Sequence, residues 1–308
     1  MIIPEKLKIG DTIGVIAPSS PIIGDNVEEL NQAKKIIENL GFKVKYSKNI
    51  FSNTNNYSAT AKEKADDINE MFADKDIKMI WCAKCVNNSN STFGYIDYEN
   101  IKKNPKIICG FSDITSLTNM ITEKTELVTF SGTNFKTVAT DETDYSLKEV
   151  LKRFVDRSLE LGLQGEEYRT IKQGVEEGQL IGGNLNLTSG MVAGKYSIDF
   201  TGKILFLEEL GFETEPAMAS NFLYYMKQNG VFDKVKGIWL GNYTHESGIK
   251  LENILLDTIG DEFKGPIIKS ENFGHIDKKT VIPIGTMARI DTNRDVKIEL
   301  LENCLSED

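Results

Sequence analysis

Histidine is almost absent from this chain, since only His245 and His275 occur among its 308 residues. The search for an imidazole base is therefore short. Long apolar runs are absent as well. No stretch approaches the ~20 consecutive apolar residues of a membrane-spanning helix, and the chain does not begin with the basic segment and apolar run of a signal peptide. We therefore expect no membrane partner and a cytoplasmic protein.

An excess of positive charge is also lacking. The chain has 36 basic and 46 acidic residues, a net charge of −10, and no basic patch stands out along it. Nucleic acid and anionic membranes are therefore not expected as partners. The 40% of hydrophobic residues is typical of a globular protein. The length allows two domains of about 100–200 residues each.

Cysteine is scarce, with four residues, of which Cys82 and Cys85 form a C-x-x-C pair. A zinc site needs a second pair of ligands at similar spacing, and the sequence has none. Residues 77–82 also read as a strand, on which positions three apart face opposite sides, so a local disulfide is disfavoured. Buried thiols are the favoured interpretation. The alternative, a thiol redox protein, predicts a reversible disulfide.

The first half of the chain alternates strand and helix patterns, which predicts parallel βαβ units. Capping boxes at Thr60 and Ser146 are expected to begin two of the helices. Glycines gather after Leu159, so we place a linker at 161–178 between an α/β domain at 1–160 and a second domain at 179–308. The strands expected in the second half lie at 203–207, 237–240, 266–269, 280–284 and 296–300. The predicted fold class is α/β, with a parallel N-terminal sheet and a smaller, strand-rich C-terminal α/β domain.

The segment around Ser112 carries the clearest chemical pattern. A short apolar run ends at Gly110, Ser112 follows, and helix-forming residues begin directly afterwards. This order is typical of a nucleophile elbow, in which a sharp turn exposes a serine at the carboxyl end of a parallel strand. The helix N-terminus that follows favours developing negative charge. The spacing meets the G-x-S-x-G pattern only in part, and an ordinary turn is the alternative.

The same segment, NPKIICGFSDIT, resembles the nucleophile region of the LD-carboxypeptidase family of serine peptidases, which includes the microcin-immunity peptidases. Seven further blocks match the family in its own order. GDTIGVIAPSS and YIDY precede this segment, and it is followed by LIGGNL, ILFLEE, GVFDKVKGI, FGH and IPIG. The loop NSNS at 88–91 resembles the microcin-immunity branch more than the muropeptide-recycling branch. The resemblance implies a peptidase without cofactor or metal that is often a homodimer.

A serine nucleophile needs a base, and the base needs a carboxylate that holds its tautomer. Both histidines lie in polar loops after expected strands. The FGH block of the resemblance selects His275. Glu208 and Glu209 end an apolar strand, and strand alternation allows only one of them to point at the base. The pattern does not choose between them, whereas the resemblance assigns the first, Glu208. The implied triad is Ser112, His275 and Glu208, in a cleft between the domains.

The oxyanion hole is where the chain departs from the family. The Asp113 N–H is one expected donor. The second would come from a glycine pair in the family, but these positions hold Cys85 and Val86, and a β-branched residue resists the φ > 0 that glycine permits. Losing one donor typically costs about 10²–10³ in rate. A binding or sequestering protein with an impaired site is therefore the alternative to an active peptidase.

Two asparagines complete the expected site. Asn184, in the Gly182-Gly183-Asn184 segment, offers a donor and an acceptor to a substrate, although a turn opening the second domain explains the segment equally well. Asn90 is the other expected substrate contact. The predicted function is hydrolysis of an amide bond in a small peptide or peptide conjugate.

Overall fold

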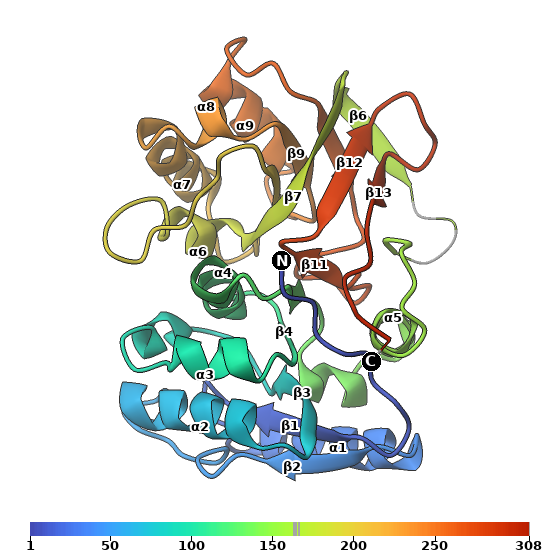
Figure 1. Ribbon diagram of the computed structural model, residues 1–308. Coiled ribbons are helices and arrows are strands. Elements are labelled where there is room, and N and C mark those ends of the chain that lie inside the picture. Colours follow the sequence, from blue (N-terminus) through green and yellow to red (C-terminus); the bar gives the residue numbers. More distant parts are fainter. Residues whose placement is uncertain (163–164, 166, 308) are drawn as a thin grey trace.

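The first half of the molecule is built on a six-stranded sheet. The computed structural model describes residues 1–162, 165 and 167–307 (Figure 1). The strands lie in the order β11-β5-β4-β3-β1-β2, and all neighbours are parallel except the edge strand β11. Their bounds are β1 (Thr12–Ile16), β2 (Lys43–Tyr46), β3 (Ile77–Cys82), β4 (Ile107–Gly110), β5 (Thr129–Ser131) and β11 (Ile282–Ile284).

Helices cover both faces of this sheet because successive strand residues face opposite sides. In β3, Met79 and Trp81 pack with α1 (Asp25–Asn39), η2 (Phe135–Ala139) and α5 (Tyr145–Phe154). Ile80 and Cys82 pack instead with α2 (Ala61–Ala73), α3 (Tyr98–Lys103) and α4 (Ile114–Thr125). The short 3-10 helix η1 (Ser89–Thr92) lies between β3 and α3 along the chain.

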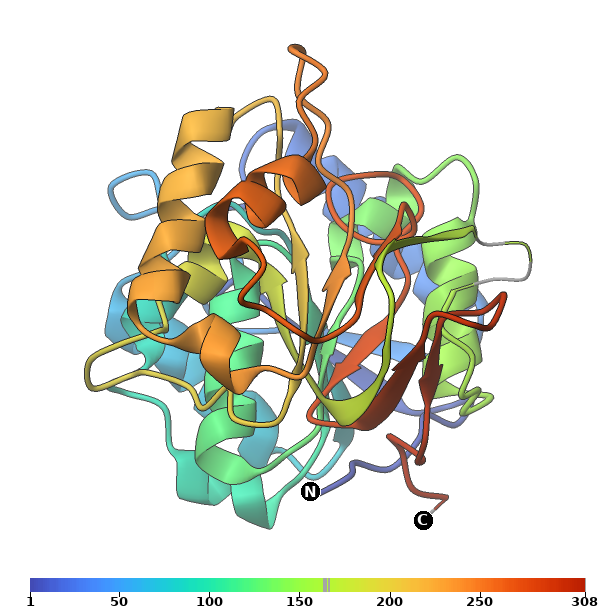
Figure 2. The ribbon, with the colours of Figure 1, turned by 90° about the horizontal axis from the view of Figure 1, so that it is seen from above.

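The second half holds a seven-stranded sheet in the order β13-β12-β7-β8-β9-β10-β6, with parallel pairing from β7 through β10. Its strands are β6 (Tyr168–Lys172), β7 (Val175–Asn184), β8 (Ile204–Glu208), β9 (Gly237–Leu240), β10 (Ile267–Ser270), β12 (Met287–Asp291) and β13 (Ile298–Leu300). Its helices are α6 (Leu185–Ser189), α7 (Pro216–Gln228), α8 (Val231–Lys234) and α9 (Leu251–Ile259). The view in Figure 2 shows these helices on one side of the second sheet. The predicted fold class is confirmed.

Helix α4 lies between the two halves (Figure 1). Its Ile114, Leu117 and Ile121 belong to the core of the first half, whereas Met120 packs with the core of the second. Nine of its twelve residues are buried. A helix with partners all round is fixed in place by both halves at once, and this helix follows directly after Ser112.

The chain also crosses between the halves near its end. Strand β11 joins the first sheet, and Cys304 and Leu305 pack into the core beside α1. Strands β6 and the start of β7 lie within the expected linker 161–178, of which residues 163, 164 and 166 fall outside the described residues. The division into 1–160, 161–178 and 179–308, whose last residue is also outside the described ones, stays a prediction.

The two predicted helix caps have different outcomes. Thr60 forms both hydrogen bonds of a capping box with Glu63, as expected. The cap at Ser146 is wrong, because α5 already begins at Tyr145 and Asp144 is its N-cap residue. The Asp141 carboxylate accepts the Ser146 N–H instead, and the Ser146 hydroxyl donates to the Asp277 carbonyl.

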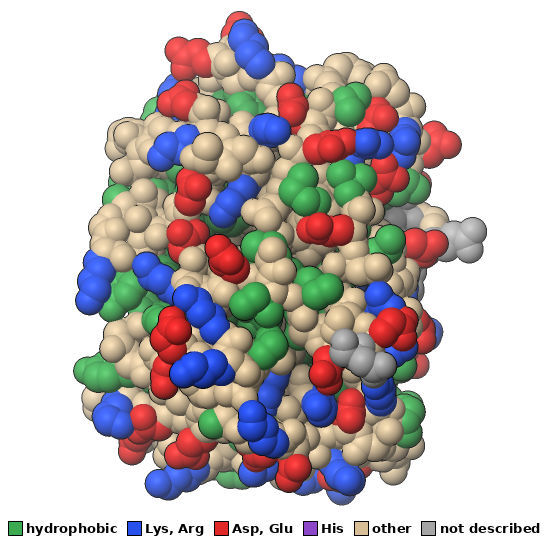
Figure 3. All heavy atoms as spheres, in the orientation of Figure 1, with side chains coloured by type: hydrophobic (Ala, Val, Ile, Leu, Met, Phe, Trp, Pro, Cys, Tyr) green, Lys and Arg blue, Asp and Glu red, His purple; other side chains and the backbone are tan. Residues whose placement is uncertain are grey.

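Charged side chains of both signs are interspersed over the face of the molecule shown in Figure 3. In the part of the chain that the structure describes, no helix is long and apolar enough to cross a membrane.

Candidate active site

Ser112 occupies the sharp turn between β4 and α4. Its φ is +60°, a left-handed conformation that is uncommon for residues other than glycine, asparagine and aspartate. Such strain concentrates at functional sites. The turn follows because β4 ends at Gly110 and the helix begins only four residues later, at Ile114. The side chain is about nine-tenths buried, with 9% of Ser112 exposed.

Ser112, His275 and Glu208 form one hydrogen-bonded chain. Ser112 Oγ lies 2.9 Å from His275 Nε2, and His275 Nδ1 lies 2.7 Å from Glu208 Oε2. The Nδ1–H donates to the carboxylate, which leaves Nε2 as the acceptor for the serine proton. The three side chains come from the elbow, the loop after β10 and the end of β8. The arrangement brings the three predicted triad residues together.

The charge of Glu208 acts on the base. Burial alone lowers the pKa of His275, but the charge of Glu208 and its hydrogen bond outweigh burial, so the pKa is raised above 6.5. Gly274 makes the close approach possible. Its φ is +115°, and a β-carbon there would meet Glu208 Oε2 at 3.0 Å. A side chain at position 274 would therefore crowd Glu208.

Glu209 points elsewhere. Its carboxylate accepts hydrogen bonds from the backbone N–H groups of Asn186 and Leu210 and from the Asn184 amide. Burial, together with the nearby Glu208 charge, raises the pKa of Glu209. Strand alternation at the end of β8 therefore separates the two carboxylates, and only Glu208 contacts the base.

Asn184 lies between these two carboxylates. Its Nδ2 donates to Glu208 Oε1 at 3.3 Å and to Glu209 Oε1 at 3.0 Å, and its Oδ1 caps α6 by accepting from Leu187 N. The residue is 3% exposed. Both the nitrogen and the oxygen of the side-chain amide that is predicted to contact substrate are thus hydrogen-bonded within the protein. Asn90, in η1, is exposed to solvent.

The predicted oxyanion donors differ in what they already bind. Among the described residues, no acceptor is hydrogen-bonded to the backbone N–H of Asp113. The N–H of Val86, in contrast, donates to Ser19 Oγ at 2.9 Å, and the Val86 side chain is 51% exposed. Ser19 in turn donates to the Asn87 carbonyl. In this structure Ser19 Oγ therefore accepts the N–H that, by its alignment with the family's glycine pair, is the predicted second donor to the oxyanion.

The Cys85 side chain lies beside Ser112. Burial raises the pKa of its thiol to about 11, against the opposing hydrogen bonds of Ser112 and Asn134. A thiol with so high a pKa stays protonated and is a poor nucleophile at neutral pH. All four cysteines are free thiols, and burial raises the pKa of Cys82 as well. The Cys82–Cys85 redox hypothesis thus gains no support.

A buried lysine holds the loop that carries Cys85 and Val86. Lys64 Nζ donates to the backbone oxygen of Asn88 at 2.7 Å and to its Oδ1 at 2.8 Å. Asn88 has a φ of +86°, and the backbone N–H of the next residue, Ser89, donates a hydrogen bond to the Asp113 carboxylate. Burial lowers the pKa of Lys64 to about 8, against the opposing charge of Asp113. Sequence reasoning missed Lys64 and Ser19, because their partners are distant along the chain.

Helix α4 fastens the segment at 182–184 to the elbow. Asn119 donates to the Gly182 carbonyl and accepts from the Gly182 N–H, at 2.8 and 3.1 Å. Thr115 Oγ1 accepts from Asn184 N at 3.0 Å, and a β-carbon at Gly183 would meet this oxygen at 2.6 Å. Gly183 thus allows the end of β7 to pack closely against α4.

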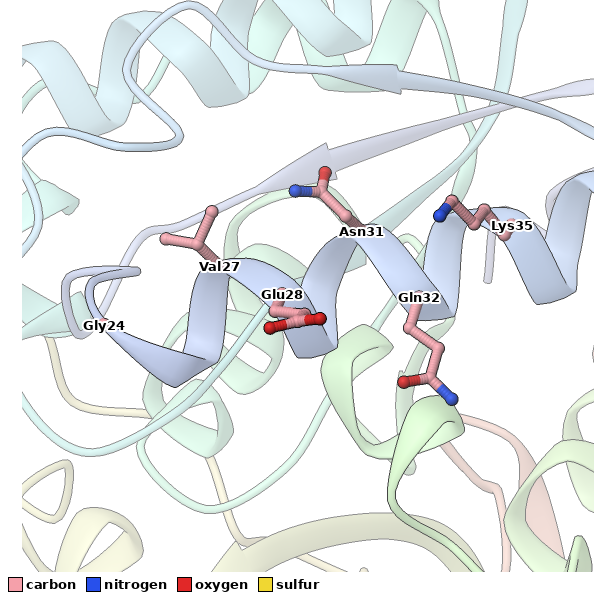
Figure 4. Close-up of a pocket in the computed structure, with 6 residues that line it drawn as sticks. All are labelled: Gly24, Val27, Glu28, Asn31, Gln32 and Lys35. Carbon is pink, nitrogen blue, oxygen red and sulfur yellow. The ribbon is translucent and has the colours of Figure 1, made fainter.

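The other histidine and one of the larger hollows lie apart from this chain of contacts. His245 bonds to Ser247 Oγ at 2.7 Å and pairs with Glu215 at 3.3 Å. Figure 4 shows a hollow of about 480 Å³ along α1, lined by Gly24, Val27, Glu28, Asn31, Gln32 and Lys35. None of these lining residues belongs to the triad.

Comparisons with known proteins identify the family and the fold of the chain. Models of the LD-carboxypeptidase N-terminal and C-terminal domains match residues 13–132 and 177–290. A probable murein peptide carboxypeptidase of Bacillus subtilis is 30% identical over 99% of this chain and 95% of its own. The Escherichia coli microcin C7 self-immunity protein MccF is 28% identical over 96% and 95%. A solved structure of MccF with glutamyl sulfamoyl guanosine has a TM-score of 0.89 at 26% identity, covering 99% of this chain and all of that one.

Proposed function

The chain belongs to the LD-carboxypeptidase family, and from this premise we propose that it is a serine peptidase that hydrolyses an amide bond in a small peptide or peptide conjugate. The observation that carries the proposal is the continuous hydrogen bonding from Ser112 through His275 to Glu208. A serine hydroxyl is a weak nucleophile, and an adjacent base of this kind activates it.

The proposed reaction has two halves. Ser112 Oγ attacks the amide carbonyl while His275 Nε2 takes the hydroxyl proton, and Glu208 stabilises the resulting imidazolium. The oxyanion accepts a hydrogen bond from the backbone N–H of Asp113. His275 then protonates the leaving amine, which departs and leaves an acyl-serine. Water, deprotonated by His275, attacks this ester, and release of the acid restores Ser112. Asn90 and Asn184 remain the proposed substrate contacts, and Asn184 reaches the reaction through Glu208.

The two histidines offer a matched test of this proposal. A fluorophosphonate reports a competent nucleophile even when the natural substrate is unknown. Ser112→Ala and His275→Ala should abolish labelling and hydrolysis of a muropeptide. His245→Ala removes the only other imidazole and should leave both near the level of the unmodified protein. Labelling that survives in Ser112→Ala, or is lost equally in the two histidine variants, would refute the assignment.

A second candidate function is binding without turnover on the same scaffold. It is favoured by the Val86 N–H, which is bonded to Ser19 rather than to the oxyanion position. With one donor missing, the protein would hold a peptide or conjugate and hydrolyse it slowly. Stoichiometric binding of a peptide conjugate with no fluorophosphonate labelling of Ser112 would support this candidate over the peptidase.

We also propose that the protein is a cytoplasmic homodimer with no membrane or nucleic-acid partner, as the family resemblance and the acidic composition predict. Light scattering across a concentration series tests the dimer. A mass of one chain at every concentration would contradict it.

A further inference from the structure

The loop that carries His275 runs from one sheet to the other. It leaves β10 after Ser270, in the second sheet, and continues into β11 at Ile282, which pairs with β5 in the first sheet. Ser112 belongs to the first half of the molecule and Glu208 to the second. The position of the base relative to each of these partners therefore depends on how the two ends of the loop are held.

The first part of this loop is held by the second half. The backbone N–H of Asn242, which follows β9, donates to the Phe273 carbonyl at 2.9 Å, and the Phe273 ring packs against Trp239 in β9. Gly274 lies close against Glu208 at the end of β8. These contacts come from β8 and β9, and they place the base beside its carboxylate.

The second part of the loop is held by α5, a helix of the first half. Ser146 Oγ donates to the Asp277 carbonyl at 3.0 Å, only two residues after His275. The backbone N–H of Val281 donates to Glu149 Oε2 at 3.3 Å. Positions 146 and 149 are three apart and share one face of the helix, so α5 presents both side chains to the loop together.

Glu149 is a buried carboxylate that takes no part in the proposed proton transfers. Only 1% of the residue is exposed. Burying such a group is costly unless it is paired and hydrogen-bonded. Its Oε1 pairs with Lys152 at 3.3 Å, and its Oε2 accepts the Val281 N–H. Both oxygens are thus in use, one on a cation and the other on the loop that carries the base.

We propose that Ser146 and Glu149 are positioning residues that hold His275 within reach of Ser112. The inference rests on the proposed peptidase function, and it assigns the two contacts of the base to different halves of the molecule. Strands β8 and β9 keep the base on Glu208, whereas α5 keeps it on the nucleophile. Misplacing a catalytic group by about 1 Å can cost on the order of 10²-fold in rate, so a loosened loop should slow the chemistry in a protein that is still folded.

The test measures the two contacts of the base separately. The rate of fluorophosphonate labelling reports the contact between Ser112 and His275. The pKa of His275, followed by proton NMR of its imidazole, reports the contact with Glu208. The chain has only two histidines, so the spectrum of His245→Ala assigns the signals.

Ser146→Ala and Glu149→Ala should each slow labelling by roughly 10–100-fold. The pKa of His275 should stay above 6.5 in both variants, because its contact with Glu208 is held from the other half. Should Glu149→Ala fail to fold, Ser146→Ala tests the proposal alone, since it leaves the buried charges in place.

Conservative variants separate positioning from a purely structural role. Ser146→Thr keeps the hydroxyl, and Glu149→Gln keeps an oxygen that accepts the Val281 N–H, so both should regain most of the labelling rate. Lys148→Ala, on the exposed side of α5, is the matched control and should label like the unmodified protein.

A role in stability alone predicts a lower midpoint of unfolding with an unchanged labelling rate of the folded variants, and this result would overturn the inference. A pKa of His275 that falls to 6.5 together with the rate would also overturn it, because α5 would then hold the base on Glu208 as well. An unmodified protein that does not label at all would instead reject the proposed function itself.

Discussion

At the scale of single residues, the base His275 links the geometry of the site to pH. Burial opposes its positive charge, yet the Glu208 carboxylate at 2.7 Å raises its pKa above 6.5. A raised pKa means that the folded protein holds the proton more tightly than the unfolded chain. The pair therefore contributes stability that is fully present below pH 6.5 and is lost as the pH rises through the folded pKa.

Activity should follow the opposite course. His275 accepts a proton only when neutral, so kcat/KM is expected to rise with pH and to reach half its maximum above pH 6.5. Glu208→Gln should move this rise to lower pH. It should also lower the maximum kcat/KM by up to about 10⁴-fold, because the carboxylate no longer holds the histidine in the reactive tautomer. Glu209→Gln, which removes a charge that does not contact the base, should move it less. A rise at the same pH in Glu208→Gln would contradict the assigned acid.

Val86 offers a second test at this scale. Cys85→Gly combined with Val86→Gly gives the loop the φ > 0 conformations of a glycine pair, so an N–H can leave Ser19 and face the oxyanion. We expect kcat on a small ester or amide to rise, by up to the roughly 10²–10³ that one donor is worth, with little change in KM. Asn87→Ala on the same loop is the control. A change confined to KM would show that the loop contributes to binding and not to the transition state.

At the scale of secondary-structure elements, α4 connects the nucleophile to the rest of the site. Asn119→Ala leaves the Gly182 N–H and carbonyl without their partners, and we expect a loss of about 2–4 kcal/mol in the free energy of unfolding. The end of β7 and the neighbouring end of β8, which carries Glu208, would also shift relative to Ser112, so kcat should fall. Urea unfolding and steady-state kinetics measure both. Lys124→Ala, on the exposed side of α4, should change neither.

The success of sequence-based prediction also varies from element to element. The bounds of β3 and β9 were predicted to the residue, because buried parallel strands are short apolar runs. Strands β6, β7 and β12 were missed. The first half of β7, VEEGQ, pairs with β12 at the edge of the core and carries polar residues, so its sequence has little strand character.

The candidate site was predictable where a short motif carries the chemistry, as at Ser112 and the FGH segment. Lys64 and Ser19 have no such signal, because their contacts are with residues distant along the chain. Ser19, for example, meets Val86 across 67 positions. The sequence makes Val86 a doubtful oxyanion donor because it is β-branched, but nothing in the local sequence indicates that a distant hydroxyl accepts its N–H.

At the scale of the whole molecule, the two halves share α4, strand β11 and the C-terminal segment. We therefore expect one cooperative unfolding transition. The two tryptophans report on it separately: Trp81 is fully buried in the first half and Trp239 in the second. Trp81→Phe and Trp239→Phe each leave one fluorescent probe. Within each variant, tryptophan fluorescence and circular dichroism should give the same midpoint and the same slope against denaturant concentration, as a single transition requires. A fluorescence change well before the loss of helix would contradict a single transition.

The distance along the chain between Ser112 and His275 bears on how the protein is made. The two residues are separated by 163 positions, and Glu208 lies between them. A ribosome that adds about 5–20 residues per second exposes the serine many seconds before the imidazole. Throughout that interval the hydroxyl has no base, and the growing chain is inert toward the peptides around it. The proposed hydrolysis can therefore begin only when the polypeptide is nearly complete, so the order of synthesis would delay activity in the way that a removable pro-segment does in many peptidases.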